Sequence, residues 1–319
     1  MDEHSGSVTV AVAQWQHHLL ADFDEFAARV AGLLDRTGDA QVVVFPEQFT
    51  MTLLTTIPGW QDLTPAEFGL VGRYTDAYRA LFQEEARRRG KAILAGSHLV
   101  GDATENRNTA HLFTPDGAIR THAKTHIFPV EADSNTREGD QLSVVDLGFV
   151  SLGLMICYES EIPEVATILA RRGAELIVCP SYTITPAGFW RVRHCAQARC
   201  IENQVFFAHC STVGHVGDPV PDGFGKSSIL SPCDVVFPAN GVLAEAAQDV
   251  EDVVIATIDL DLLYENRRTG AAPTFADRLR RAAFYRKHAD ELLADAAMVG
   301  PAVSPDGAID RRPPERVPR

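Results

Sequence analysis

The sequence feature that most restricts the fold of this chain is an apolar run that ends abruptly at a cysteine. Residues 150–156 are predominantly apolar and predict a buried strand, and the pattern after Cys157 predicts a helix over residues 160–172. A strand and a helix that meet at a cysteine hold its thiol in a defined place, and a helix N-terminus favours the thiolate. Cysteine is also among the most frequently buried residue types. This stretch alone therefore leaves two interpretations open, a reactive nucleophile and a core side chain.

Polar residues also follow two other apolar strands. Residues 41–45 are a largely β-branched run that stops at a proline, so that Glu47 lies just beyond a strand buried on both faces. Another predicted strand ends at Lys124. Polar side chains at strand ends are where α/β enzymes hold their chemistry. Each residue alone has an ordinary interpretation as a surface side chain, but Cys157, Glu47 and Lys124 together supply a nucleophile, a base and a cation for acyl transfer.

Strands and helices alternate along the chain in two broad halves that meet near residue 140. This pattern predicts two mixed β-sheets covered by helices in a single domain, residues 1–297. Residues 298–319 contain five prolines and predict an extended tail rather than a second domain. The stretches expected to form helices are residues 21–36, 64–89, 160–172, 187–203 and 278–297.

Composition and charge exclude several classes of function. The formal net charge of −14 argues against a nucleic-acid partner, because phosphate contacts need clustered lysine and arginine. No apolar segment approaches the length of a membrane span, and the N-terminal residues lack the pattern of a signal peptide. The six cysteines show no CxxC pair or metal-type spacing, and His17 and His18 are expected to be a solvated pair. We therefore expect a cytoplasmic protein with reduced thiols and no membrane partner.

Three segments of the chain resemble the signature blocks of the nitrilase superfamily, the carbon–nitrogen hydrolases. They are residues 45–47, 124–128 and 156–159. Further matches lie at residues 108–110, 163–164, 199–203 and 258–260, within a resemblance that covers residues 8–270. The resemblance implies a four-layer αββα sandwich, in which helices flank two mixed β-sheets. It also implies a homodimer or higher oligomer that packs the helices after the cysteine against each other, and no metal or organic cofactor.

The resemblance implies a role for each site residue. Cys157 attacks an amide carbonyl, and Glu47, whose pKa should be raised in a semi-enclosed pocket, passes the thiol proton to the leaving amine. Lys124 and the backbone N–H of Tyr158 hold the oxyanion. Glu131, at the place of the family's second glutamate, orients Lys124 and the substrate. Water activated by Glu47 then hydrolyses the thioester.

The residues after the cysteine bear on the choice of substrate. True nitrilases commonly carry Trp where this chain has Tyr158, and members that bind a substrate carboxylate often carry Arg where it has Glu161. Glu161 therefore fits an amine-bearing or neutral amide better than an α-carboxylate. The alternative is that Glu161 is a first-turn helix residue favoured by the macrodipole. Phe128, Tyr182 and Trp190 are further candidates for the pocket, together with Tyr158.

These features predict an amidohydrolase that cleaves a non-peptide C–N bond of a small linear amide through a cysteine thioester and releases ammonia or an amine. Two alternatives use the same Glu-Lys-Cys triad, a nitrilase and an N-carbamoyl amine hydrolase. An alternative of another class is an inactive dimeric scaffold. The presence of all three triad residues and Glu131 speaks against the scaffold.

Overall fold

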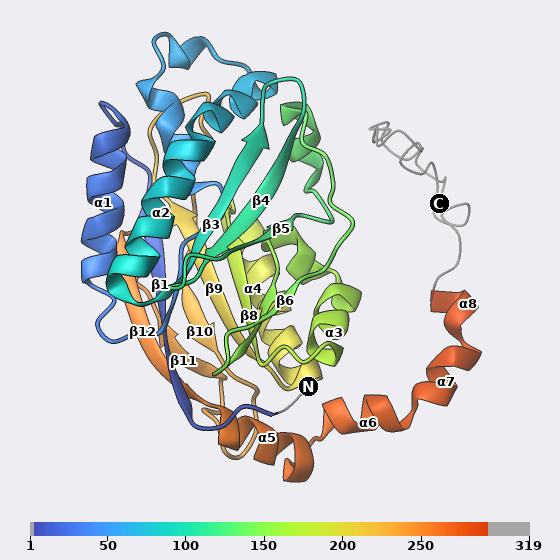
Figure 1. Cartoon of the computed structure of the whole chain (residues 1–319). Helices are drawn as coiled ribbons and strands as arrows, with labels where there is room; N and C mark the ends of the chain where they lie inside the picture. Colours follow the sequence, from blue (N-terminus) through green and yellow to red (C-terminus); the bar gives the residue numbers. More distant parts are fainter. Residues whose placement is uncertain (1–2, 293–319) are drawn as a thin grey trace.

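The structure, a computed structural model, describes residues 3–292 (Figure 1). The tail expected over residues 298–319 lies outside the described residues. The strands are β1 (Ser7–Gln16), β2 (Val42–Val44), β3 (Ala92–Gly101), β4 (Asn106–Phe113), β5 (Ile119–Ala123), β6 (Val144–Asp146), β7 (Ser151–Leu154), β8 (Leu176–Ser181), β9 (Phe206–Val213), β10 (Ser228–Leu230), β11 (Val242–Glu245) and β12 (Asp252–Asp259). The helices are α1 (Phe23–Asp35), α2 (Thr75–Arg89), α3 (Pro163–Arg171), α4 (Pro186–Asn203), α5 (Leu260–Thr269), α6 (Thr274–Arg280), α7 (Ala282–Lys287) and α8 (Ala289–Leu292).

Within the described residues, the strands form one large mixed sheet with flanking helices. Its order is β5-β4-β3-β2-β1-β9-β8-β7-β6, with β12 beside β1, and with β10 between β9 and β11. The prediction of two separate sheets is wrong because β1 is long enough to belong to both halves. It pairs with β12 through residues 7–14, and its last two residues, Trp15 and Gln16, pair with Thr212 and Val213 of β9.

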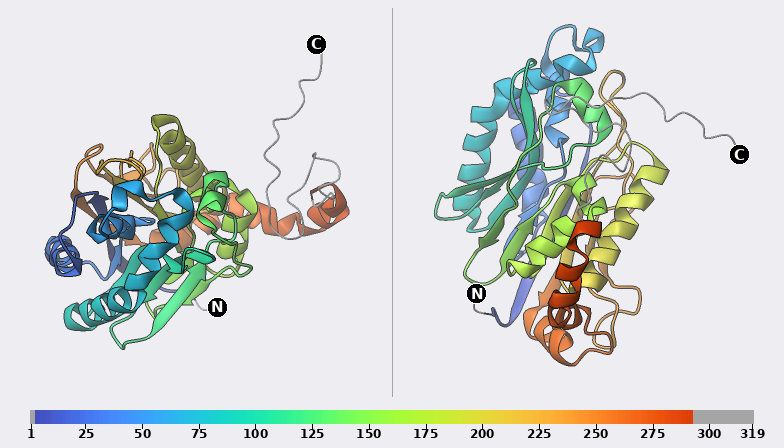
Figure 2. Two further views of the ribbon diagram at one scale, coloured as in Figure 1. Left: turned by 90° about the horizontal axis from the view of Figure 1, so that it is seen from above. Right: turned by 90° about the vertical axis from the view of Figure 1, so that its right-hand side faces the viewer.

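The two halves of the sheet bury apolar side chains on both faces. Side chains of β1 alternate with the period of two expected for a strand. Ala11 and Ala13 pack in a core with α1 and α2, whereas Val10 and Val12 pack in a second core with residues of β7 and β8. A third core joins α3 and α4 to the other half of the sheet. Figure 2 shows α2 and α4 on opposite sides of the strands.

Proline and local geometry divide two of the expected helices. The chain after β7 forms a short 3-10 helix, η5 (Cys157–Glu161), and α3 starts only at Pro163. Ile162 is extended, as expected for a residue that precedes proline. The helix expected over residues 64–89 begins as a 3-10 helix, η3 (Pro65–Tyr74), and continues as α2. The helix expected over residues 278–297 is instead the short series α6, α7 and α8 as far as residue 292.

Candidate active site

The ends of three strands bring the predicted site residues into one cavity. Glu47 follows β2, Lys124 follows β5 and Cys157 follows β7. Glu131 lies in the short 3-10 helix η4 (Pro129–Ser134). All four residues line a cavity of about 370 Å³.

Lys124 lies between two carboxylates. Its Nζ donates to Glu47 Oε1 at 2.8 Å and to Glu131 Oε2 at 2.5 Å. Asn108 of β4 bridges the same carboxylates, because its Nδ2 donates to Glu47 Oε1 at 2.8 Å and to Glu131 Oε1 at 2.7 Å. Lys124 is 1% exposed and Glu47 is 3% exposed. Buried charges need partners of this kind, so the network holds the ammonium group in one place. Asn108 lies in one of the segments that resemble the family, but the sequence analysis assigned no role to it.

Cys157 occupies an unusual backbone conformation at the start of η5. Its φ is +42°, in the left-handed region that residues other than glycine rarely adopt. The preceding Ile156 is extended, and its N–H donates to Glu159 Oε2 at 2.6 Å. Cys157 thus starts a five-residue 3-10 turn instead of the expected α-helix. The helix N-terminus expected to favour a thiolate is not at this residue.

Burial dominates the ionisation of the cavity groups. It raises the pKa of the Cys157 thiol well above its usual range, Glu47 adds to the effect, and Lys124 opposes it. Burial also raises the pKa of Glu47, with Lys124 opposing and Glu131 supporting the shift. For Lys124, burial opposes the charge, but Glu131 and Glu47 outweigh it and hold the pKa well above its usual value. The raised pKa of Glu47 agrees with the expectation from the sequence. The raised pKa of Cys157 favours the neutral thiol, which is opposite to the influence expected of a helix N-terminus.

Tyr182, directly after β8, connects Cys157 and Glu47. Its N–H donates to Glu47 Oε2 at 2.7 Å, and Cys157 Sγ lies 4.0 Å from its carbonyl oxygen. Its hydroxyl donates to the carbonyl oxygen of Pro221 and lies 3.0 Å from His17 Nε2. Tyr182 is therefore anchored by its side chain, while its backbone contacts both Cys157 and Glu47.

His17 contacts Tyr182, and the sequence analysis did not identify it as part of the candidate site. The expectation of a solvated pair is wrong for it, since His17 is 1% exposed, although His18 is exposed. Burial, with the nearby charges of His18 and Arg29, lowers the pKa of His17 to about 3. The Tyr182 hydroxyl already donates to Pro221, so neutral His17 must donate from Nε2 to the Tyr182 oxygen. No local sequence signal marks this contact, because the two residues are distant in the chain.

A second buried network ties the turn at the cysteine to the strand end at the lysine. Glu159 is fully buried and accepts from the N–H and hydroxyl of Thr125 at 2.7 and 2.6 Å. His122 Nε2 lies 2.9 Å from Glu159 Oε2. Burial opposes ionisation of Glu159, but His122 and Thr125 outweigh it and hold the pKa of its carboxyl below the usual value. Because Glu159 also accepts from the N–H before Cys157, this carboxylate fixes Lys124 and Cys157 relative to each other.

Four of the five predicted pocket residues line the cavity: Phe128, Tyr158, Glu161 and Tyr182. The rings of Phe128 and Tyr158 are in edge contact, with centroids 5.6 Å apart. The fifth candidate, Trp190, is not among the residues that line this cavity. Its side chain is 47% exposed on α4 and stacks on His194 instead of reaching the cavity.

Glu161 is paired in the structure. Arg191 Nε donates to its Oε2 at 2.6 Å, and both side chains line the cavity. In the sequence analysis, Glu161 was considered as an isolated negative charge that would disfavour a substrate with a carboxylate group. Because Arg191 neutralises that charge, the charge of Glu161 alone does not favour an amine-bearing or neutral substrate. The two residues are separated by 30 positions, and Trp190 was the residue of this helix that the sequence analysis assigned to the pocket.

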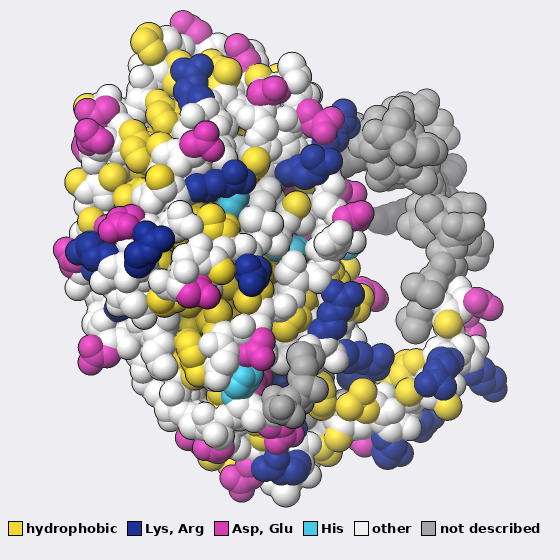
Figure 3. Space-filling model, in the orientation of Figure 1, with side chains coloured by type: hydrophobic (Ala, Val, Ile, Leu, Met, Phe, Trp, Pro, Cys, Tyr) yellow, Lys and Arg dark blue, Asp and Glu magenta, His cyan; other side chains and the backbone are white. Residues whose placement is uncertain are grey.

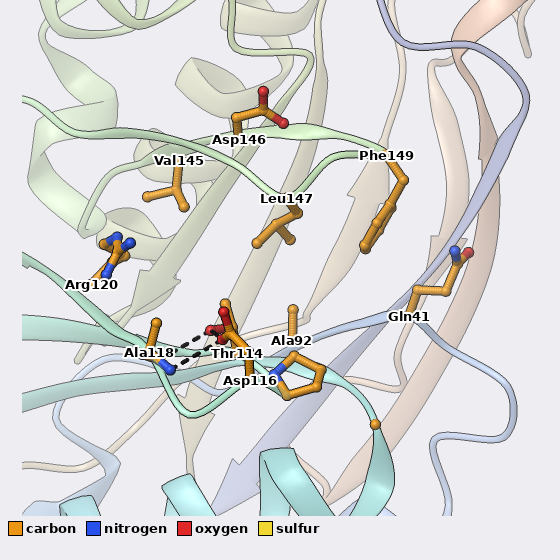
Figure 4. A pocket seen from close by; sticks show the side chains of 12 residues that line it. Gln41, Ala92, Thr114, Asp116, Ala118, Arg120, Val145, Asp146, Leu147 and Phe149 are labelled. Atoms are coloured by element: carbon orange, nitrogen blue, oxygen red, sulfur yellow. Dashed lines mark hydrogen bonds between the residues drawn. The ribbon is translucent and has the colours of Figure 1, made fainter.

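A second cavity, of about 460 Å³, lies between the β4–β5 turn and the β6–β7 turn (Figure 4). Its wall includes Asp116, Arg120, Asp146, Leu147 and Phe149. It contains none of the predicted site residues. Over residues 3–292, no group of three or more His, Cys, Asp or Glu side chains is arranged to hold a metal ion. Nor does any helix of that part have the length and apolar character needed to cross a membrane.

Comparisons with known proteins agree with this architecture. Residues 9–268 match the family model described as carbon-nitrogen hydrolase. The probable hydrolase YhcX of Bacillus subtilis (strain 168) is 34% identical over 279 residues, which cover 86% of this chain and 54% of that protein. The chain thus spans about half the length of this relative. An (R)-stereoselective amidase of Pseudomonas sp is 32% identical over 233 residues, covering 72% of this chain and 77% of that protein.

A solved structure shows the same fold. Saccharomyces cerevisiae Nit3, a member of branch 10 of the nitrilase superfamily, is similar with a TM-score of 0.67 at 22% identity, covering 84% of this chain and 96% of that chain. Since the family model spans most of the sequence and the fold is nitrilase-like, the resemblance read from the three sequence segments is confirmed. This chain belongs to the carbon–nitrogen hydrolases of the nitrilase superfamily.

Proposed function

We propose that the chain is an amidase that cleaves the C–N bond of a small linear amide through a thioester on Cys157. The observation that carries the proposal is a single cavity in which a neutral buried thiol meets a carboxylate and a fixed ammonium group. A neutral thiol is a weak nucleophile and needs a base in contact with it. Glu47 is that base, because its raised pKa brings it closer to the pH at which it must accept and return a proton.

The first half of the reaction forms the thioester. Glu47 takes the thiol proton as Cys157 Sγ attacks the carbonyl carbon, which gives a tetrahedral intermediate with a negatively charged oxygen. Lys124 and the backbone N–H of Tyr158 stabilise this oxygen, and loss of one such donor lowers the rate by about 10²- to 10³-fold. Glu47 then protonates the nitrogen, the C–N bond breaks, and ammonia or an amine leaves.

The second half releases the acid. Glu47 takes a proton from water, the hydroxide attacks the thioester carbonyl, and the C–S bond breaks. The proton returns to Cys157 and a carboxylic acid is released. Glu131 acts throughout by holding Lys124, which it contacts at 2.5 Å. The similarity to the Pseudomonas amidase supports an amide as the substrate.

The experiment is a screen of linear amides, nitriles and ureido compounds with ammonia and carbon dioxide as readouts. Amides should release ammonia without carbon dioxide, and a denatured sample taken during turnover should show an acyl adduct on Cys157 by mass spectrometry. Cys157→Ala should abolish turnover and adduct, whereas Cys195→Ala, which changes a partly exposed thiol, should retain both. Turnover by the Cys157→Ala variant contradicts the proposed mechanism.

The same screen separates the alternatives. Carbon dioxide release indicates an N-carbamoyl amine hydrolase, and ammonia from nitriles alone indicates a nitrilase. The scaffold alternative gains if no compound reacts and iodoacetamide labels Cys157 no faster than the other thiols. A homodimer and a cytoplasmic location belong to the same proposal.

A further inference from the structure

A group of buried polar side chains lies between α4 and the strands β9 and β10, and none of them lines the active-site cavity. His209 and Ser211 of β9 and Ser228 of β10 are 0% exposed, and Arg193 of α4 is 7% exposed. Both ring nitrogens of His209, the two serine hydroxyls and Arg193 Nε have no hydrogen-bond partner among residues 3–292. Buried polar atoms are nearly always hydrogen-bonded, so each exception calls for an explanation, such as a water molecule or an ion.

The register of the sheet places these side chains on one face. Ser228 and His209 are paired directly across β10 and β9, so their Cβ atoms lie about 5 Å apart on the same face. Ser211 follows His209 by two residues and therefore lies on that face as well. The helix α4 covers it, because the centroid of the Phe189 ring lies 6.0 Å from that of His209. Arg193 follows Phe189 by about one helical turn and therefore lies over the same part of the sheet.

Arg193 is held by its two terminal amino groups, which leaves Nε for another acceptor. Its Nη1 donates to Gln197 Oε1 at 3.3 Å, and its Nη2 lies 3.6 Å from Glu245 Oε1. Glu245 is paired with Ser228 across β11 and β10, which brings Arg193 close to that serine. Because an arginine nitrogen can only donate, the buried Nε needs an acceptor.

The charges around this group favour an anion over a cation. Lys226 forms an ion pair with Glu245 Oε2, and Arg193 shares the same carboxylate, so two positive charges face one negative charge. Burial, with the charge of Arg193, lowers the pKa of His209 to about 3, so its imidazole is neutral and adds no charge. A neutral imidazole donates one N–H and each serine donates its hydroxyl hydrogen, which with Arg193 Nε gives four donors. A single anion can accept from all four, whereas a buried water molecule typically makes about three hydrogen bonds in total.

We propose that Arg193, His209, Ser211 and Ser228 form a buried binding site for a small monatomic anion, such as chloride. Arg193 Nε, the two serine hydroxyls and one ring N–H of His209 donate to it. A monatomic anion suits the site because it needs little room between a packed helix and sheet and accepts hydrogen bonds from any direction. The proposal does not depend on the amidase function.

The site also lies behind the segment that carries Glu47. Thr212 follows Ser211 in β9, so its side chain is on the opposite face of the strand. From that face its hydroxyl donates to the Glu47 carbonyl oxygen at 2.7 Å. An anion that fixes β9 against α4 therefore stabilises a strand that supports the candidate active site.

Bromide in a crystal of the full chain tests the position of the site. Bromide replaces chloride and scatters anomalously, so a soak in sodium bromide should give an anomalous peak at hydrogen-bond distance from Arg193 Nε and the hydroxyls of Ser211 and Ser228. Electron density without an anomalous signal at that place would identify water and overturn the proposal.

Thermal unfolding tests whether the site binds chloride in solution. Sodium chloride replaces sodium gluconate at constant ionic strength, and the midpoint of the unchanged protein should rise by about 2 °C or more between about 1 and 300 mM chloride. Arg193→Gln should abolish this rise. Arg191→Gln, which removes the same charge from a half-exposed position of the same helix, should retain it. If Arg193→Gln does not fold, Ser228→Ala removes one donor with little change in volume and should reduce the rise.

Two outcomes in solution would overturn the proposal. A midpoint that does not depend on chloride, even with a bromide peak in the crystal, would mean an adventitious ion only. A rise of equal size in the unchanged protein and in Arg193→Gln or Ser228→Ala would mean that chloride acts elsewhere on the protein.

Discussion

At the scale of single residues, burial makes the ionisable groups of the candidate site depend on one another. Burial raises the pKa of the Cys157 thiol and so favours its neutral form, and in the proposed mechanism Glu47 removes its proton. Lys124 cannot serve as a base, because Glu47 and Glu131 hold it protonated. The chemistry of each side chain is thus set by its contacts and not by its type. This dependence predicts how the pH profile responds when one partner is removed.

Glu131→Gln should move the acid limb of kcat/KM to lower pH. The negative charge of Glu131 is one cause of the raised pKa of Glu47, so removing it lowers that pKa and leaves Glu47 ionised in more acidic solution. In the unchanged enzyme, the pKa that defines this acid limb should lie above the ordinary glutamate pKa of about 4.3. The measurement is kcat/KM for an amide against pH, with the exposed Glu105→Gln as a control that should not move the limb. A limb that moves upward in Glu131→Gln contradicts the assignment of Glu47 as base.

His17 should act on turnover through Tyr182. His17→Leu removes the donor to the Tyr182 hydroxyl and should lower kcat by about tenfold or more with little change in KM. Glutamine places an N–H close to the position of the histidine Nε2, so His17→Gln should recover much of the loss. His18→Gln, which changes the exposed neighbour, should behave as the unchanged enzyme. Equal losses in the Leu and Gln variants would mean that ring packing, not the hydrogen bond, is what matters.

At the scale of elements, an irregularity in β3 supports the segment that carries Glu47. The pairing of β3 with β4 shifts register between Leu94 and Ser97, as at a β-bulge. Within this irregularity Ser97 N–H donates to the carbonyl oxygen of Pro46 at 3.3 Å, and Ser97 Oγ accepts from Gln48 N–H at 3.2 Å. The two hydrogen bonds bracket Glu47 on either side. The position of the carboxylate therefore depends on the backbone of a neighbouring strand.

Gly96→Ala should destabilise the protein and reduce turnover together. Gly96 has a φ of +62°, and an added Cβ would lie 1.9 Å from the carbonyl oxygen of Pro46. The strain and the displaced backbone should cost about 3 kcal/mol or more in the free energy of unfolding. Gly90→Ala is a close control, since its φ is +66° with no atom within 4 Å of the added Cβ. It should cost only about 1 kcal/mol and leave kcat unchanged. Chemical denaturation and amide turnover measure both effects, and equal costs for the two variants would contradict the argument.

At the scale of the whole molecule, the helices after the cysteine present apolar side chains to solvent. Ile168 of α3, Ile201 of α4 and Leu279 of α6 are 38%, 39% and 48% exposed. Arg278 fastens α6 to these helices by donating to Asn203 Oδ1 at 2.8 Å and to Thr167 Oγ1 at 2.7 Å. From there α7 and α8 lead away from the body (Figure 1), with apolar side chains among the lysines and arginines (Figure 3). Exposed apolar side chains on neighbouring elements are typical of a protein–protein interface.

Ile201→Glu and Leu279→Glu should weaken the homodimer expected from the resemblance. A charge placed in a buried apolar contact is costly, so each variant should shift a dimer toward monomers at micromolar concentration. Sedimentation equilibrium measures the shift. Val235→Glu changes a side chain that is 88% exposed in the turn between β10 and β11 and should leave the dimer intact. An unchanged protein that sediments as a monomer would contradict the expectation.

The sequence alone determined which residues lie at the strand ends that line the candidate site. Apolar runs of strand length and the prolines or polar residues that end them are local properties, so Glu47, Lys124 and Cys157 could be placed at strand ends without coordinates. The segments around these residues also carried the family resemblance that the comparisons confirm. Glu131 could be placed only through that resemblance.

The tertiary structure decided the properties that depend on distant neighbours. The length of β1 joins the expected two sheets into one, and burial leaves Cys157 a neutral thiol despite the helix expected after it. His17 and Arg191 acquired partners far away in the chain, which no periodic pattern reveals. The physical reason is that strand formation follows from adjacent residues, whereas pairing, burial and pKa follow from residues that meet only after folding.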